Sequence, residues 1–220
     1  ISTGLVGSEM CIRDRFYPIG GINPRPPLFS WSLAIGAMIL QPFLGEEAVW
    51  WSMLALPAIY GALTILPVAA IARDHFGKAA GVIAAWLIAF MPAHVTHSTW
   101  GLADHDSFVM LFIAIGFMFY LRAVKYAGSE RLVRTTSIRP LDMLRAMGAV
   151  ARERQYAMAN AVLAGVAFGA ASLGWKGFVV GPAILFLAYA AQVALNMFRR
   201  RDSTILSTLF LTMLLTNLLI

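Results

Sequence analysis

Charged side chains are scarce in this chain. Only 13% of its 220 residues are Asp, Glu, Lys or Arg, whereas 60% are hydrophobic. A soluble domain carries about 25% charged residues, so there are too few here to cover a surface that faces water. The single cysteine, Cys11, excludes an intramolecular disulfide and a cysteine-based metal site. The composition predicts a protein that lies largely within a membrane.

Several long stretches lack Asp, Glu, Lys, Arg and His altogether: residues 50–71, 79–92, 107–121 and 177–197. A spanning helix needs about 20 mostly apolar residues. We therefore expect membrane helices near 48–72, 79–95, 107–126, 157–174 and 177–198, and a sixth that begins near Ser203. The predicted fold is all-α, a polytopic transmembrane bundle of about six membrane helices.

Segment 30–44 is too short to be assigned in the same way. It has about 15 residues, follows Pro26 and Pro27, and ends before Glu46 and Glu47. A helix of this length either spans the membrane or lies in its interface. Both interpretations are open from the sequence.

The residues at both ends of the chain predict that it is a fragment of a longer protein. Residues 5–15 resemble translated sequencing-adaptor read-through and contain no apolar core long enough for a signal peptide. At the other end, Ile220 lies inside an apolar run. We expect residues 1–15 to be a non-native lead-in and 16–220 to be a partial transmembrane domain, truncated at both ends.

The net charge of +6 does not indicate a nucleic-acid partner, because the basic residues lie in short clusters between apolar runs. Three connecting segments hold 13 of the 17 basic residues: Arg73, Lys78, Arg122, Lys125, Arg131, Arg134, Arg139, Arg145, Arg152, Arg154, Arg199, Arg200 and Arg201. The alternate connections, 96–106 and the one near Gly174, contain only Lys176. The positive-inside rule predicts that the basic loops are cytoplasmic and that 96–106 faces the opposite side.

The connection at 94–106 is the most polar boundary between two apolar runs. Asp104 and Asp106 flank His105, and two more histidines precede them. Carboxylate oxygens suit Mg²⁺ or Mn²⁺. An aspartate before Ser107 could instead cap the following helix and complement its dipole. Local chemistry leaves the metal site and the helix cap as alternatives.

Residues 100–108, Trp-Gly-Leu-Ala-Asp-His-Asp-Ser-Phe, resemble the second external acidic motif of oligosaccharyltransferases. Residues 17–21 and 26–31 look like the end of the first external loop in that family, and 72–81 are similar to its basic turn. The order and spacing resemble the archaeal and bacterial single-subunit enzymes from about Phe16 to Ala190. The resemblance implies a glycosyltransferase bundle of the GT-C type.

In that family the positions of Asp104 and Asp106 bind a catalytic divalent cation, Mn²⁺ or Mg²⁺. The resemblance therefore makes both aspartates the predicted catalytic and metal-binding residues. The other two acidic ligands of the family have no assignable counterpart between Phe16 and Ile220.

Two further residues are expected to contact the lipid phosphate. His97 lies seven residues before Asp104, where the family commonly has arginine. Lys176 lies in 174–178, which matches a family loop near the lipid pyrophosphate. The alternatives are an interfacial polar role for His97 and snorkelling of Lys176 to the interface.

The implied reaction transfers an oligosaccharide from a polyprenyl (di)phosphate carrier to Asn in Asn-x-Ser/Thr of an acceptor protein. The implied location is a prokaryotic cell membrane, with membrane lipids as neighbours and the Asp104 loop on the extracytoplasmic side. A related glycosyltransferase that uses polyprenyl-phosphate sugars is the first alternative. A transporter is the second, although ion-coupled transporters usually place ionisable residues within their spans.

Overall fold

The computed structural model describes residues 26–101, 104–128, 145, 148–149, 151–201 and 203–220. Its principal elements are all helical, as predicted: α2 (Leu28–Leu44), η1 (Gly45–Glu47), α3 (Ala48–Phe76), α4 (Lys78–Phe90), α5 (Pro92–His97), α6 (Asp106–Ala127), α8 (Gln155–Ser172), η2 (Lys176–Val179), α9 (Val180–Phe198) and α10 (Thr204–Leu218). The predicted lead-in at 1–15 and the matching segment 17–21 lie outside the described residues.

Three stretches of the described chain are long and apolar enough to cross a membrane: Leu28–Phe76, which contains α2, η1 and α3, then Asp106–Ala127, and Lys176–Phe198. Helices α4 and α10 are apolar but shorter. The all-α membrane bundle is thus confirmed, while length and composition alone support three spans, fewer than the six expected.

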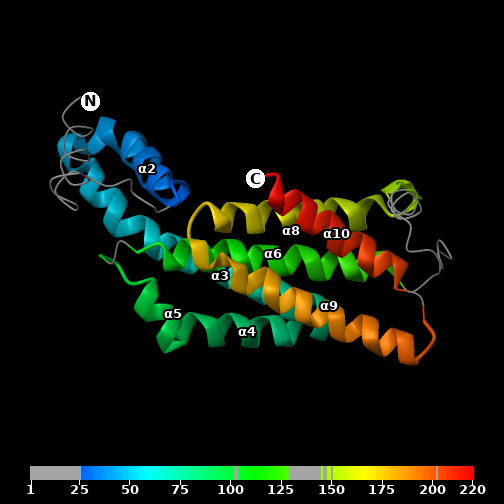
Figure 1. The fold of residues 1–220 in the computed structure, drawn as a ribbon. Helices are drawn as coiled ribbons and strands as arrows, with labels where there is room; N and C mark the ends of the chain where they lie inside the picture. The colour runs from blue at the N-terminus through cyan, green and yellow to red at the C-terminus, as the bar shows by residue number, and fades with distance from the viewer. Residues whose placement is uncertain (1–25, 102–103, 129–144, 146–147, 150, 202) are drawn as a thin grey trace.

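The predicted span 79–95 is wrong in its bounds, because α4 ends at Phe90 and the short α5 begins at Pro92. Proline disfavours the helical conformation of the residue before it. Met91 accordingly is extended, with φ −66° and ψ 117°. The break turns the chain into α5, which ends at His97 beside the acidic loop (Figure 1).

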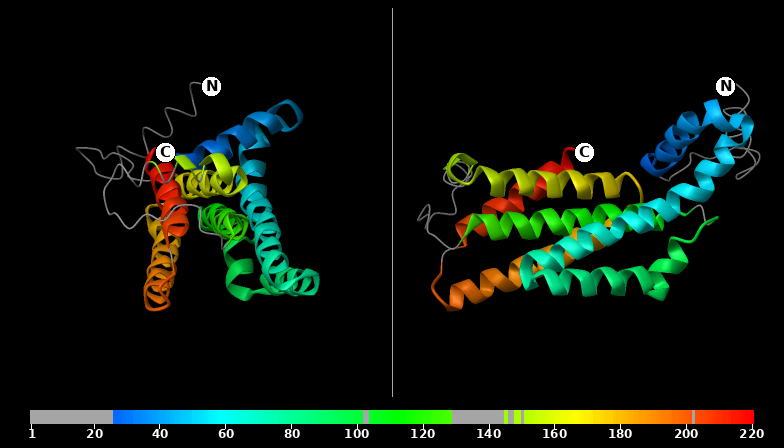
Figure 2. Two further views of the ribbon diagram at one scale, coloured as in Figure 1. Left: turned by 90° about the vertical axis from the view of Figure 1, so that its right-hand side faces the viewer. Right: turned by 180° about the vertical axis from the view of Figure 1, so that it is seen from behind.

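Helices α6 and α8 form the centre of the bundle, and α10 packs on α8 (Figures 1 and 2). The buried positions of α8 are nearly all small: Ala157, Ala161, Ala164, Gly165, Ala167, Gly169 and Ala171. Small residues let helix backbones approach closely, which favours association where no hydrophobic force acts between helices. Phe168 is the large exception and is fully buried.

Helix α2 folds back against the first half of α3. Ser52 of α3 donates a hydrogen bond to the Leu33 carbonyl at 2.6 Å. A Cβ atom on Gly36 would lie 2.7 Å from the Leu56 side chain, so the two helices touch closely at this point. This contact gives α2 a fixed place beside α3, whether it spans the membrane or lies in its interface.

The two kinds of connection lie at opposite ends of the bundle. The end of α5, the start of α6 and η2 meet at one end, whereas the α3–α4 turn and the α9–α10 turn lie toward the other (Figure 1). At the second end, Arg122 of α6 donates to the Asp74 carboxylate of α3 at 2.6 Å. We call the two ends the acidic end and the basic end. The predicted separation of the loops is confirmed for the described residues, and 129–144 lie outside them.

Candidate functional site

Helix α5 packs so closely on α3 at Gly61 that no side chain would fit at that position. His94 Nε2 lies 3.1 Å from the Gly61 carbonyl oxygen. Ser98 donates a hydrogen bond to the His94 carbonyl at 2.7 Å. A Cβ atom on Gly61 would lie only 2.2 Å from the Ser98 Cβ. Glycine at this position therefore sets where α5 ends and where His97 lies.

Replacing Gly61 with alanine is expected to push α5 away from α3. Overpacking of this kind costs about 1–3 kcal/mol. The unfolding midpoint of the purified protein should fall accordingly. Gly148→Ala is the matched control, since no described residue lies within 4 Å of its added Cβ atom. Equal midpoints for the two variants would contradict the close α3–α5 contact.

The acidic loop enters α6 with its carboxylates arranged around His105. One Asp104 oxygen accepts the backbone N–H of His105 at 2.7 Å and lies 2.8 Å from His105 Nδ1. The other ring nitrogen, Nε2, lies 3.6 Å from an Asp106 oxygen. The sequence indicates His105 only as the residue between two aspartates. Its contact with both was not predicted, because it depends on the turn into α6.

Among the described residues, the hydrogen-bonding part of the helix-cap interpretation is not supported, whereas its dipole part is compatible with the position of Asp106. His105 is the residue that precedes α6, and no side chain makes a cap hydrogen bond there. Asp106 is the first residue of the helix and can complement the helix dipole. Asp104 lies before the helix and bonds to His105, so neither carboxylate satisfies the free N–H groups of the first turn.

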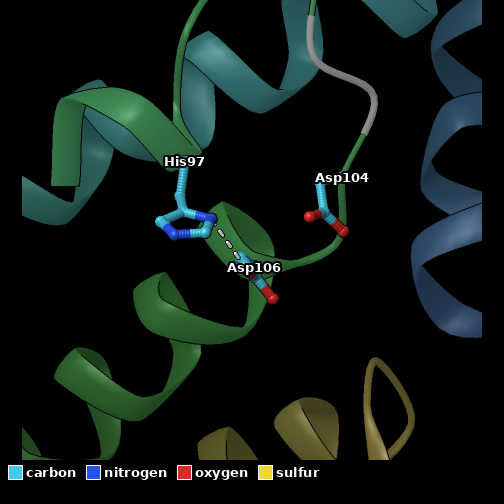
Figure 3. A group of neighbouring side chains, drawn as sticks. All are labelled: His97, Asp104 and Asp106. Atoms are coloured by element: carbon cyan, nitrogen blue, oxygen red, sulfur yellow. Dashed lines mark ion pairs between the residues drawn. The ribbon is translucent and has the colours of Figure 1, made fainter. Parts of the chain in front are cut away.

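Three of the predicted site residues lie together. His97 Nδ1 is 2.9 Å from an Asp106 oxygen. One ligand atom each from His97, Asp104 and Asp106 lies within 4.8 Å of the others. Figure 3 shows His97 at the end of α5, Asp104 on the loop and Asp106 at the start of α6. Two carboxylates and one imidazole could hold Mg²⁺ or Mn²⁺, with other positions left for water or substrate oxygens.

An aromatic cluster adjoins these residues through His105 and joins three segments. The His105 ring lies 6.4 Å from Phe29 and 5.9 Å from Trp175, measured between ring centroids. Phe29 also meets Phe108 at 5.9 Å in an edge-to-face arrangement. The backbone N–H of Leu28 donates to a carbonyl of the loop after α8 at 2.9 Å. The start of α2, the acidic loop and the 173–178 loop are thereby held together.

Lys176 is placed beside the site but does not join it. It begins η2 and is exposed, next to Trp175, whose ring contacts His105. Among the described residues, Lys176 has no ion pair with Asp104 or Asp106. His97, the other predicted phosphate contact, is instead paired with Asp106. Its proximity to the carboxylates was not predicted from the sequence.

The family identity follows from two comparisons. Residues 5–220 match the family described as oligosaccharyl transferase STT3, N-terminal. The chain is also 32% identical over 183 residues to dolichyl-phosphooligosaccharide-protein glycotransferase 3 of Archaeoglobus fulgidus. That match covers 81% of this chain and 19% of the relative, so the chain spans about a fifth of that protein's length. No solved structure matches the chain significantly.

The family match and the apolar helices agree in indicating an integral membrane protein. The match runs through α5, the acidic loop and α6, so the cluster of His97, Asp104 and Asp106 lies within the matched region. The resemblance inferred from residues 100–108 is thereby confirmed. This chain belongs to the oligosaccharyl transferase STT3 family and carries its N-terminal region.

Proposed function

We propose that the full-length protein transfers an oligosaccharide from a polyprenyl (di)phosphate carrier to Asn of Asn-x-Ser/Thr in acceptor proteins. The observation that carries the proposal is the convergence of Asp104, Asp106 and His97 at one end of an apolar helix bundle of this family. The lipid-linked donor and the protein acceptor meet at the membrane boundary. Side chains that act on both must lie there.

The reaction requires stabilisation of the negative charge that develops on the phosphate. The acceptor amide nitrogen is a poor nucleophile, and the departing group is an anionic phosphate. A bound Mg²⁺ or Mn²⁺ would offset the charge that develops on that phosphate. Asp104 and Asp106 would hold the cation, and the contacts of His105 with both carboxylates would keep them in place. Acidic ligands from other parts of the full-length protein would complete the site.

His97 and Lys176 have separate proposed roles. His97 lies against Asp106, so its imidazole is placed either to ligate the cation or, when protonated, to contact the phosphate. Lys176 is exposed beside Trp175, whose ring contacts His105, and it would contact a phosphate bound next to the aromatic cluster. Loss of the Lys176 charge should weaken donor binding and leave cation binding intact, whereas loss of His97 should affect both if it is a ligand.

The test is an assay of the full-length protein in membranes with a lipid-linked oligosaccharide. A peptide with Asn-x-Thr should be glycosylated, and its Gln-x-Thr counterpart should not. A chelator should abolish the reaction, and Mn²⁺ or Mg²⁺ should restore it. Transfer of a single sugar from a polyprenyl-phosphate donor, without use of the oligosaccharide, would establish the related glycosyltransferase instead.

We also propose that the acidic end faces the extracytoplasmic side of a prokaryotic cell membrane. The reason is the concentration of basic residues at the opposite end. In a variant without Cys11, a membrane-impermeant maleimide should label Thr99→Cys in intact cells. It should label Arg152→Cys only after permeabilisation. Labelling of both positions in intact cells would contradict this orientation.

A further inference from the structure

The turn between α9 and α10 presents three consecutive arginines, Arg199, Arg200 and Arg201, at the basic end of the bundle. All three are exposed. We propose that this turn binds the headgroups of anionic phospholipids in the leaflet that surrounds the basic end. The proposal does not depend on the catalytic activity, because the turn lies at the opposite end from the acidic loop (Figure 1).

The first part of the turn is ordered by backbone hydrogen bonds at the C-terminus of α9. The backbone N–H of Arg201 donates to Asn196 at 2.8 Å, and that of Arg200 donates to Met197 at 3.1 Å. This is the Schellman arrangement that closes many helices. The Asn196 side chain donates to Ser203 Oγ at 3.0 Å and ties the turn to the start of α10. A ligand would therefore meet arginines whose backbone is already ordered.

The backbone of Arg200 is unusual for its residue type. Its φ is +52°, and among the described residues it is the one non-glycine with a positive φ. Glycine, or sometimes asparagine, usually takes this position in a Schellman turn, because a Cβ atom is strained there. An arginine at a position that favours glycine indicates a role for its guanidinium that offsets the strain.

The arginines of this turn differ from those at the α3–α6 contact. Arg73 and Arg122 both pair with Asp74. Within the part of the chain that the structure describes, which leaves out the adjacent Asp202, the guanidinium groups of the turn have no ion-pair partner. Cations at a helix C-terminus also complement the dipole, but that effect would not require an arginine in the left-handed region. Exposed guanidinium groups are suited to phosphate, which they bind through a planar fork of donors.

Exposed apolar side chains adjoin the same turn and indicate a lipid surface. Phe198 is 89% exposed and Met197 is 73% exposed. At a membrane boundary such side chains lie among the acyl chains while neighbouring guanidinium groups meet the lipid phosphates. A soluble phosphate compound would use the arginines but not the apolar residues. The arginines together with the exposed apolar side chains indicate a phospholipid as the ligand.

The experiment titrates phosphatidylglycerol onto the full-length protein in detergent and follows bound lipid by native mass spectrometry. Arg199→Gln/Arg201→Gln should weaken binding by about 25-fold, because each guanidinium that contacts the bound headgroup contributes a factor of about five. Lys78→Gln/Arg152→Gln is the matched control, since it removes the same charge from exposed positions at the same end. Its binding should change by less than about five-fold.

Two comparisons decide the outcome. Equal weakening by both double variants would overturn the proposal in favour of a diffuse effect of net charge. Binding of glycerol phosphate as tight as that of phosphatidylglycerol would overturn the commitment to a lipid surface. Phosphatidylcholine should bind to the unaltered protein and to Arg199→Gln/Arg201→Gln alike.

The variant Arg200→Gly distinguishes an effect on folding stability from an effect on lipid binding. Glycine relieves the strain of the positive φ, so the thermal unfolding midpoint should rise or stay unchanged. The same variant should bind phosphatidylglycerol about five-fold more weakly. Undiminished lipid binding by Arg200→Gly would show that the guanidinium is not used and would overturn its part in the site.

Discussion

Asp104→Asn in the full-length protein is expected to lower peptide glycosylation by at least about 100-fold, which corresponds to roughly 3 kcal/mol of transition-state stabilisation. The amide keeps the size of the carboxylate but loses its charge. Membrane insertion should be unaffected, because Asp104 makes no helix-cap hydrogen bond to α6. The measurement is glycosylation of an Asn-x-Thr peptide in membranes with Mn²⁺, corrected for protein level.

Binding of Mn²⁺, followed by its paramagnetic resonance signal, gives a second measurement that does not depend on turnover. Affinity should fall in Asp104→Asn and in Asp106→Asn. Glu153→Gln is the control, since it removes an exposed carboxylate outside the acidic end. Normal turnover and normal Mn²⁺ affinity in Asp104→Asn would rule out a metal-binding role.

The fold class could be predicted because the apolar runs are long and interrupted by charge only at their ends. The bounds of α6 illustrate this: the expected 107–126 became Asp106–Ala127. The predicted span 79–95 failed because hydropathy averages over Pro92, whose effect on the preceding backbone is local. The placement of α2 against α3 depends on Gly36 and Ser52, and these contacts leave no periodic signal in the sequence.

At the site, the aspartates could be found because they are unusual at the edge of an apolar run. Their partners could not. His97 reaches Asp106 only because the close contact between Gly61 and Ser98 places α5 beside the start of α6. Trp175 lies far from His105 in the sequence, and no local sequence pattern indicates that their rings are in contact. The types of the site residues could be identified from the sequence, whereas the distances between their side chains depend on helix packing.

The packing that positions α6 can be tested at Phe168, whose ring lies between two glycines. A Cβ atom on Gly116 of α6 would lie 2.8 Å from the ring, and one on Gly181 of α9 would lie 2.9 Å from it. The ring is fully buried and meets Phe117 edge-on at 5.9 Å. Phe168→Ala is expected to cost about 3 kcal/mol through the cavity it leaves. Gly116→Ala is expected to cost about 1–3 kcal/mol through overpacking.

Together the two substitutions should cost less than the sum of their separate effects, by about 1 kcal/mol or more, because the methyl group that Gly116→Ala adds enters the space that the Phe168 ring vacates. The free energy of unfolding in detergent, measured for the parent and three variants, gives this coupling. Phe168→Ala with Gly148→Ala is the control cycle and should be additive, since no described residue lies within 4 Å of a Cβ atom added at Gly148. Additivity in both cycles would mean that α6 and α8 do not meet through this ring. The start of α6 at Asp106 would then be positioned by its contacts with α3 and α5 instead.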